Sequence, residues 1–392
     1  MSKIDIVGGI YRERCAFPYW DQLFGSAGRA ASALSGLVET IRLHSALSET
    51  EELTAEAMFS ADLRLTRRPT PIEFDYLHTL AVPKISLSRV IAPVAMPAVT
   101  GDVVMQFGMM ESEPRVTARY AIYDPQSAVD PLPFSRSGST ADHLAIIANR
   151  GEIAKMARTQ SFEDAVASIF LSEKPEVLIV KDGMNGATVI ASGQRHHIPA
   201  FKATSVFTIG SGDVFVAAFS YAWAINGMRP EDAARFASLS TAHYVETRAL
   251  PIAPPAETLA GSREVAVKAG GRIYLAGPFR ETGQRMLIDD ARVHLRGLGM
   301  DVFSPIHDIG PGGAELVVRQ DLDAIRQCDA VFAILNGSSP GTVFEVGYAR
   351  ALGKPVFCVT QNMRDVDLKL PKGAGAFLHD DYVSALHHIA WR

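Results

Sequence analysis

Residues 329–360 read DAVFAILNGSSPGTVFEVGYARALGKPVFCVT, and this stretch decides the fold of its part of the chain. Two short apolar runs, AVFAIL and PVFCV, have the length and the residue types of buried strands. The segment between them has the composition of a helix. Two strands joined through a helix run parallel in a sheet, so the stretch predicts a βαβ unit.

The same alternation of strand and helix patterns continues outward from this stretch. RIYLAG and MDVFSP, at 272–277 and 300–305, are strand-like, and Leu287, Ala291 and Leu295 between them fall on one helical face. The N-terminal part of the chain repeats the pattern, beginning with KIDIV. We therefore predict an α/β fold throughout, with ligands at the carboxyl ends of parallel strands.

The 392 residues of the chain are too many for one ordinary hydrophobic core, so two domains are expected. The proline-rich segment LPIAPPAETLAGSRE, at 250–264, falls between two strongly patterned regions. We predict a larger α/β domain over 1–255, a linker over 256–269, and a smaller Rossmann-like α/β domain with a parallel sheet over 270–392.

Charge and composition exclude several classes of protein. The formal net charge of −5 gives no basic surface for nucleic acid. The longest apolar run, VFVAAFSYAWAI at 214–225, is shorter than the roughly 20 residues that cross a bilayer, and it predicts a buried helix. Three scattered cysteines make neither a disulfide framework nor a zinc site. We expect a cytoplasmic protein that binds neither nucleic acid nor a membrane.

Glu345 is a carboxylate between Phe344 and Val346 in a segment that otherwise reads as buried. The sequence predicts a helix that starts at Gly341-Thr342, with Glu345 in its first turn, where the positive end of the helix would keep the carboxylate ionised. Asp321 and Asp323 are predicted at another helix start. Two carboxylates across a pocket are the groups that cleave glycosidic bonds, although each could instead cap its helix.

The motifs around these acids resemble the nucleoside 2-deoxyribosyltransferase family over residues 271–360. The matching segments are YLAGPF, DL-x-x-I-x-x-x-D and GT-x-FE-x-GYA-x-ALGKPV. The resemblance implies a covalent glycosyl–enzyme intermediate on Glu345, with Asp321 as the proton-handling acid and Tyr274 orienting the nucleophile. It also implies a homo-oligomer, such as a dimer, because sites in that family are often completed by a neighbouring subunit.

One branch of this family fits the details best. No acidic residue lies between Asp329 and Glu345, where transferases of free nucleosides usually carry an aspartate. Ser339 and Arg280 instead resemble the residues that bind the 5′-phosphate in nucleoside 5′-monophosphate N-hydrolases. A turn at Gly277 would add backbone N–H groups that can bind an anion.

A second glycine turn precedes the apolar run of the N-terminal domain. In TSVFTIGSGDVFVAAF, at 204–219, the turn Gly210-Ser211-Gly212 would direct backbone N–H groups and a helix dipole at an anion. Asp213 follows directly, where it can accept the proton of a hydroxyl group. An anion site beside a positioned base is what phosphoryl transfer requires.

This segment resembles the signature of the ribokinase-like (PfkB) family of sugar and nucleoside kinases. IYDPQ, VLIVKDGMNGATVI and the N-x-x-E pattern of Asn149 and Glu152 follow in that family's order, and FGSAGRAASAL resembles its early sugar-contacting segment. The resemblance implies a ribokinase-like fold, ATP and Mg²⁺ as cofactors, Asp213 as the base, an anion hole at Gly210, Ser211 and Gly212, and a magnesium-supporting role for Asn149 and Glu152.

Two departures from this family bear on whether the first domain is an active kinase. Phe207 stands where the family usually has an aspartate, and Ile209 stands where it has a threonine. We therefore keep two readings of this domain: an active kinase, and a scaffold that only binds a nucleotide or nucleoside.

The two resemblances together predict an enzyme that acts on a small-molecule nucleoside. The kinase would phosphorylate the 5′-hydroxyl, and the second domain would then release the free base and a (deoxy)ribose 5-phosphate. Two alternatives remain open. The second domain could act on free nucleosides while the kinase phosphorylates the released sugar, or an inactive kinase domain could serve as a nucleotide sensor.

Overall fold

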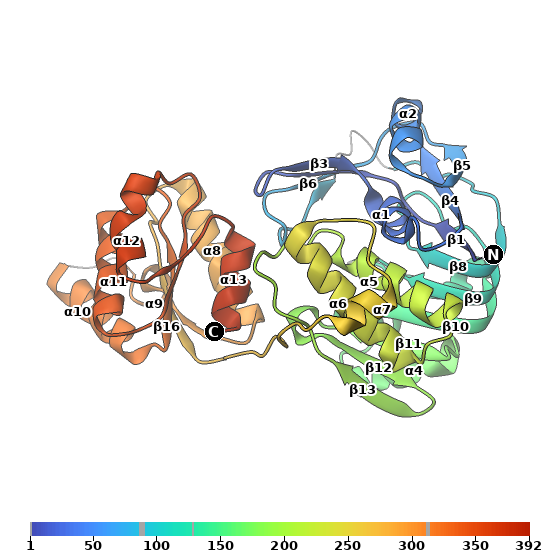
Figure 1. Cartoon of the computed structure of the whole chain (residues 1–392). Coiled ribbons are helices and arrows are strands. Elements are labelled where there is room, and N and C mark those ends of the chain that lie inside the picture. Colours follow the sequence, from blue (N-terminus) through green and yellow to red (C-terminus); the bar gives the residue numbers. More distant parts are fainter. Residues whose placement is uncertain (1, 86–90, 128, 311–313) are drawn as a thin grey trace. The chain divides into compact units, whose positions relative to one another are not determined.

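The computed structural model describes residues 2–85, 91–127, 129–310 and 314–392 (Figure 1). The chain forms two compact units, Met1–Ala203 with Phe207–Ala266, and Thr204–Val206 with Val267–Arg392. Most of the expected linker 256–269 therefore folds with the first unit. Its residues form helix α7 (Pro255–Ala260), and Ala266 donates a backbone hydrogen bond to Ala200.

The first unit is built on a nine-stranded sheet with the strand order β13-β12-β11-β10-β9-β8-β1-β4-β5. The strands from β11 to β5 in this order pair in parallel, and β12 and β13 are antiparallel additions at one edge. The bounds are β1 (Lys3–Val7), β4 (Thr40–Leu47), β5 (Asp62–Arg67), β8 (Val99–Phe107), β9 (Val116–Asp124), β10 (Thr140–Asn149), β11 (Val177–Lys181), β12 (Ala187–Ala191) and β13 (Gln194–Ile198).

Helices cover both faces of this sheet (Figure 1). On one face α5 packs between α1 and α6, and α3 and α4 pack on the other face. A further helix, α2, follows β4. The bounds are α1 (Gly25–Leu34), α2 (Glu49–Met58), α3 (Arg150–Met156), α4 (Phe162–Ser172), α5 (Ser211–Ser220) and α6 (Pro230–Thr247).

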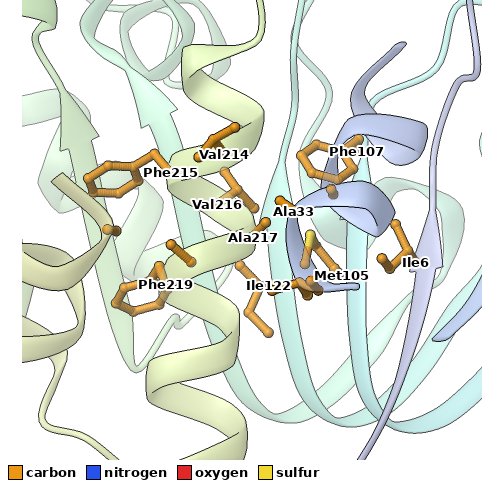
Figure 2. Packing of buried hydrophobic residues seen from close by; sticks show 14 of the residues in the cluster. Ile6, Ala33, Met105, Phe107, Ile122, Val214, Phe215, Val216, Ala217 and Phe219 are labelled. Atoms are coloured by element: carbon orange, nitrogen blue, oxygen red, sulfur yellow. The ribbon is translucent and has the colours of Figure 1, made fainter. Parts of the chain in front are cut away.

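The apolar run 214–225 is buried over most of its length, as predicted, and only Tyr221, Ala224 and Ile225 are partly exposed. Helix α5 carries apolar side chains on opposite sides. Figure 2 shows Val216 and Ala217 directed toward Ala33 and the strand residue Ile122, while Phe219 points away from them. The run is not a single α-helix, since it continues after Ser220 as a π-helical turn. Within the described ranges, no helix is both long enough and apolar enough to cross a membrane.

A small four-stranded sheet in the first unit has the order β3-β2-β6-β7. Its strands are β2 (Arg12–Cys15), β3 (Trp20–Leu23), β6 (Glu73–Tyr76) and β7 (Lys84–Ile85). Phe207 is a core residue beneath it, with its ring centroid 5.0 Å from that of Trp20. Ile209 is also buried, so both departures from the kinase signature are apolar packing residues here.

The second unit has a five-stranded, fully parallel sheet with the order β15-β14-β16-β17-β18. The four predicted strands are present, and β18 is an addition that the sequence patterns did not predict. Helices α8 and α13 cover one face, and α10, α11 and α12 cover the other (Figure 1). The bounds are β14 (Arg272–Ala276), α8 (Thr282–Gly297), β15 (Asp301–Phe303), α9 (Pro305–Asp308), α10 (Ala314–Gln327), β16 (Ala330–Ile334), α11 (Pro340–Ala351), β17 (Val356–Val359), α12 (Lys369–Gly373), β18 (Phe377–His379) and α13 (Tyr382–Ala390).

Candidate active sites of the two units

In the second unit, Glu345 of α11 lies beside the end of the parallel sheet. The hydroxyl of Tyr274, on β14, donates a hydrogen bond of 2.7 Å to Glu345 Oε1. Tyr274 is fully buried, so its ring cannot move away from this position without opening the core. The tyrosine therefore fixes one carboxylate oxygen and leaves the other for chemistry.

The predicted helix starts differ from the observed ones, by one residue for the helix of Glu345 and by several residues for the helix of the two aspartates. Helix α11 begins at Pro340, which places Glu345 in the second turn rather than the first. Proline is favoured at the first position of a helix because its missing N–H group has no partner there anyway. Helix α10 begins at Ala314, so Asp321 and Asp323 lie in its second half rather than at its start.

The structure distinguishes the two aspartates of α10. Asp323 is exposed and pairs with Arg326, with 2.5 Å between Oδ1 and Nη1. Asp321 has a buried Oδ1 without a hydrogen-bond partner among the described residues. Its charge acts on both Glu345 and Tyr274. Asp321 therefore lies near the nucleophile candidate, and Asp323 belongs to the surface.

Burial decides the ionisation of these acids, against our expectation that the helix dipole would keep Glu345 ionised. Burial raises the pKa of Glu345 to about 7, the Tyr274 hydrogen bond lowers it, and the charge of Asp321 raises it further. Burial likewise raises the pKa of Asp321 to about 6. Between these two pKa values the pair holds one proton, which the order of the values places mainly on Glu345. The arrangement that cleavage needs, with Glu345 ionised and Asp321 protonated, is then the less populated form of the same singly protonated pair.

Two loops next to this pair contain possible anion donors. Strands β14 and β16 pair in parallel, so the loops that follow them start at the same edge of the sheet. The first loop contains Gly277 and the exposed Arg280, and the second ends at Ser339, directly before α11. In the described parts of the chain, Arg280 has no ion-pair partner and the Ser339 hydroxyl has no hydrogen bond. These groups are available for an anionic ligand.

In the first unit, the predicted glycine turn leads into α5. Gly210 precedes the helix with a φ of +77°, a conformation that other residues rarely adopt. Ser211 and Gly212 form the start of the helix, and Asp213 lies in its first turn. The backbone N–H groups of this turn and the helix dipole form a possible anion hole beside the Asp213 carboxylate.

Arg29 of α1 is the partner of Asp213, and the sequence motifs did not predict this pairing. Its Nη1 donates a hydrogen bond of 2.8 Å to Asp213 Oδ2, and the same guanidinium binds Glu13 through both terminal nitrogens. Its Nε donates to the Tyr244 hydroxyl at 3.0 Å. The one feature of the sequence that could have indicated this pairing is an arginine within GSAGRAASAL, a helix that otherwise consists mainly of small residues.

The second oxygen of Asp213 is also engaged. Gln126 Nε2 donates a hydrogen bond of 2.6 Å to Asp213 Oδ1. Gln126 has a φ of +44°, which is unusual for a residue other than glycine, and it also binds Ser26 of α1. A hydroxyl group that approaches Asp213 must therefore share or displace the amide of Gln126.

A cavity of about 790 Å³ opens in front of this carboxylate. The small sheet contributes Glu13, Phe74 and Tyr76 to its wall. Gly210 and Asp213 line the same cavity, so the anion hole and the base face one space. Its other lining residues include many apolar and aromatic side chains, among them Tyr11, Val82, Pro83, Ile85, Phe107, Met109, Met110, Tyr123 and Phe134.

The N-x-x-E pair forms the start of α3. Glu152 N donates to Asn149 Oδ1 at 2.9 Å, and Asn149 N donates to Glu152 Oε2 at 2.8 Å, which is a reciprocal capping box. Glu152 also lines the cavity. Burial and the charge of Asp124 raise the pKa of Glu152 to about 7. The structure therefore brings Glu152 to the predicted site, while the Asn149 side-chain oxygen caps the helix.

Comparisons with known proteins give two families. Residues 138–255 match the pfkB family of carbohydrate kinases, and residues 273–381 match the nucleoside 2-deoxyribosyltransferase family. A 5-hydroxymethyl-dUMP N-hydrolase from Rattus norvegicus is 38% identical over 57 residues, which are 14% of this chain. The match spans 35% of the length of that relative. Both families consist of enzymes, and this chain is an enzyme with one domain of each.

Solved structures resemble the chain in fold. A fructokinase from Vibrio cholerae O395, with fructose, ADP and a calcium ion bound, has a TM-score of 0.50 at 14% identity, covering 66% of this chain and 98% of its own. A ribokinase from Arabidopsis thaliana complexed with ribose and ATP has a TM-score of 0.47 at 18% identity, with the same coverage. The likeness to the fructokinase shows a shared fold only.

The buried cluster around Arg29 gives a stability prediction. Arg29→Met should destabilise the first unit by about 3–5 kcal/mol, because it leaves the Glu13 and Asp213 carboxylates buried without their cation. Urea unfolding at pH 7 measures the change. Arg195→Met is the matched control, since it removes an arginine from the exposed pair with Glu163 and should leave the unfolding curve nearly unchanged. Equal effects of both variants would contradict the assignment.

Proposed function

We propose that this chain, which joins a pfkB-family carbohydrate kinase domain to a nucleoside 2-deoxyribosyltransferase domain, is a bifunctional enzyme of nucleoside processing. The first unit transfers a phosphoryl group from ATP to the 5′-hydroxyl of a nucleoside. The second unit then cleaves the N-glycosidic bond of the resulting 5′-monophosphate. The products are a free base and a (deoxy)ribose 5-phosphate.

The observation that carries the cleavage step is the hydrogen bond between Tyr274 and Glu345, with Asp321 close enough for its charge to act on Glu345. An ionised oxygen of Glu345 attacks C1′ of the sugar as the bond from C1′ to the base breaks. Asp321 gives its proton to the departing base. It then takes a proton from a water molecule, whose oxygen attacks C1′, and the Glu345 carboxylate leaves.

Selection of a 5′-phosphorylated substrate is supported by the charges beside this pair. Among the described residues, Arg280 has no ion-pair partner and the Ser339 hydroxyl has no hydrogen bond, and the start of α11 adds backbone N–H groups. No carboxylate lies between Asp329 and Glu345 to repel a dianion. We propose that Gly277, Arg280 and Ser339 bind the phosphate of the substrate.

In the proposed phosphorylation step, the Asp213 carboxylate is the base that accepts the proton of the substrate hydroxyl. The turn at Gly210, Ser211 and Gly212 would hold the phosphates of ATP. Glu152, a buried carboxylate on the cavity wall, fits the role of binding Mg²⁺ with ATP, with Asn149 fixing the start of its helix. The bound Mg-ATP supplies the phosphoryl group and neutralises part of its charge.

One observation favours a second candidate for the first unit. Both oxygens of Asp213 already accept hydrogen bonds, one from Arg29 and one from Gln126. A base with both oxygens engaged suits a unit that binds a nucleotide or nucleoside without phosphorylating it. In this second candidate the glycosidase acts alone, and ATP is not consumed.

The deciding experiment measures base release from a panel of nucleosides with and without Mg-ATP. We expect release to require ATP in the wild type and to be lost in both Asp213→Ala and Glu345→Gln. Nucleoside 5′-monophosphates should bypass Asp213→Ala but not Glu345→Gln, because they enter after phosphorylation. Equal cleavage of free nucleosides without ATP would refute the order of the two steps and the phosphate-binding role of Arg280 and Ser339.

The two aspartates of α10 give a paired test of the acid. Asp321→Asn should slow base release from a 5′-monophosphate by about 100- to 10,000-fold, the usual contribution of a general acid. Asp323→Asn should leave the rate near that of the wild type, because Asp323 is exposed and pairs with Arg326. Steady-state kinetics on both variants decide between the two residues. If Asp323→Asn released base slowly and Asp321→Asn released it at the wild-type rate, Asp323 would be the acid instead.

The raised pKa values predict a narrow pH optimum for base release. The productive pair holds one proton, so kcat/KM should be bell-shaped with limbs near the pKa values of about 6 and about 7. Tyr274→Phe removes the hydrogen bond that lowers the pKa of Glu345, so the upper limb should move to higher pH. Ionisation of the substrate phosphate affects the pH profiles of the wild type and of Tyr274→Phe equally, so it cannot cause a difference between them. An unchanged upper limb would exclude Glu345 as its source.

A further inference from the structure

Lys181 is a partly buried cation that the mechanism above does not use. It ends β11, and its side chain is 20% exposed. Its Nζ lies 2.6 Å from Oδ2 of Asp124, which ends β9 and is fully buried. Burial would lower the pKa of Lys181, but the charges of Asp124 and Glu152 raise it overall, so the ammonium stays protonated.

The hydrogen bonds of this ammonium are incomplete. A lysine ammonium has three N–H donors, and in the residues that the structure describes Lys181 has one acceptor, on Asp124. Largely buried polar groups normally have hydrogen-bond partners, so water or a bound ligand supplies those that the protein does not. The two remaining donors are therefore available to an anionic acceptor.

The position of Lys181 places these donors at the anion hole. A Cβ atom added at Gly212 would lie 3.4 Å from Lys181 Nζ, so the ammonium is next to the first turn of α5. The charge of Asp213 also acts on Lys181. Strands β9, β10 and β11 pair in parallel and end together, which gathers Asp124, Glu152 and Lys181 at one edge of the sheet.

We propose that Lys181 binds the terminal phosphate of the phosphoryl donor and that Asp124 is its positioning residue. Three carboxylates, those of Asp124, Glu152 and Asp213, surround the anion hole and would repel a polyphosphate. The Lys181 ammonium supplies the fixed positive charge that offsets them, together with the N-terminus of α5. This inference rests on the kinase half of the proposed function.

During transfer, the oxygen of the substrate hydroxyl forms a bond to the terminal phosphorus of ATP, and the bond from that phosphorus to the ADP oxygen breaks. The hydroxyl proton passes to the Asp213 carboxylate. Lys181 remains protonated throughout and neutralises charge on the non-bridging oxygens of the moving phosphoryl group.

Calorimetric titration tests the proposal without requiring turnover. The probes are Mg-ATP, inorganic pyrophosphate and AMP, which separate a polyphosphate from a single phosphate on the same nucleoside. We expect Lys181→Met to weaken binding of Mg-ATP and pyrophosphate at least tenfold and binding of AMP much less. Lys174→Met, which removes an exposed lysine of the same unit, is the matched control and should bind all three like the wild type.

A double variant guards against a folding defect. Lys181→Met leaves Asp124 buried and unpaired, whereas Lys181→Met with Asp124→Asn removes both charges and should fold with the Tm of the wild type within a few degrees. It should still fail to bind pyrophosphate tightly. Normal binding of Mg-ATP and pyrophosphate by the double variant would overturn the proposal.

The outcomes separate this inference from the proposed function. If polyphosphate binding depends on Lys181 but no phosphate reaches any nucleoside, the inference stands and the phosphorylation step falls. If phosphate is transferred and Lys181→Met binds and transfers normally, the inference alone is wrong. If the wild type binds neither Mg-ATP nor pyrophosphate, both are refuted.

Discussion

The parallel pairing of strands is the constraint on which both candidate sites depend. In the second unit, the pairing of Ala276 with Ala333 starts two functional loops at the same edge of the sheet. In the first unit, three neighbouring parallel strands end close together and bring Asp124 and Lys181 into contact. In each site, the register of the parallel strands places charged residues at the same edge of the sheet. Residues that are far apart in the sequence therefore meet there.

Features with a local physical cause could be predicted from the sequence. The strands around Tyr274 and between 330 and 334 follow from runs of buried apolar residues, and the turn at Gly210 follows from glycine's access to positive φ. Helix starts were predicted less well, because capping signals compete along the chain. Pro340 fits the first position of α11, one residue before the predicted start, and this places Glu345 in the second turn.

Pairings across the fold could not be predicted in this way. Arg29 and Asp213 are 184 residues apart, and Lys181 and Asp124 are 57 residues apart. A sequence shows which charged residues are present, but not which two of them will form a buried ion pair. The same reason explains the ionisation of Glu345, which depends on how deeply the helix packs rather than on its position along the helix.

Gly210 meets two demands that no other amino acid can meet together. Its φ of +77° forms the turn before α5, and a Cβ atom there would lie 2.1 Å from Nε of Arg29. Any side chain would both strain the backbone and push the buried guanidinium away from its carboxylates. Loss of Arg29 would relieve the clash but not the backbone strain, so a substitution at Gly210 is tolerated only if the turn before α5 and the packing of Arg29 change together.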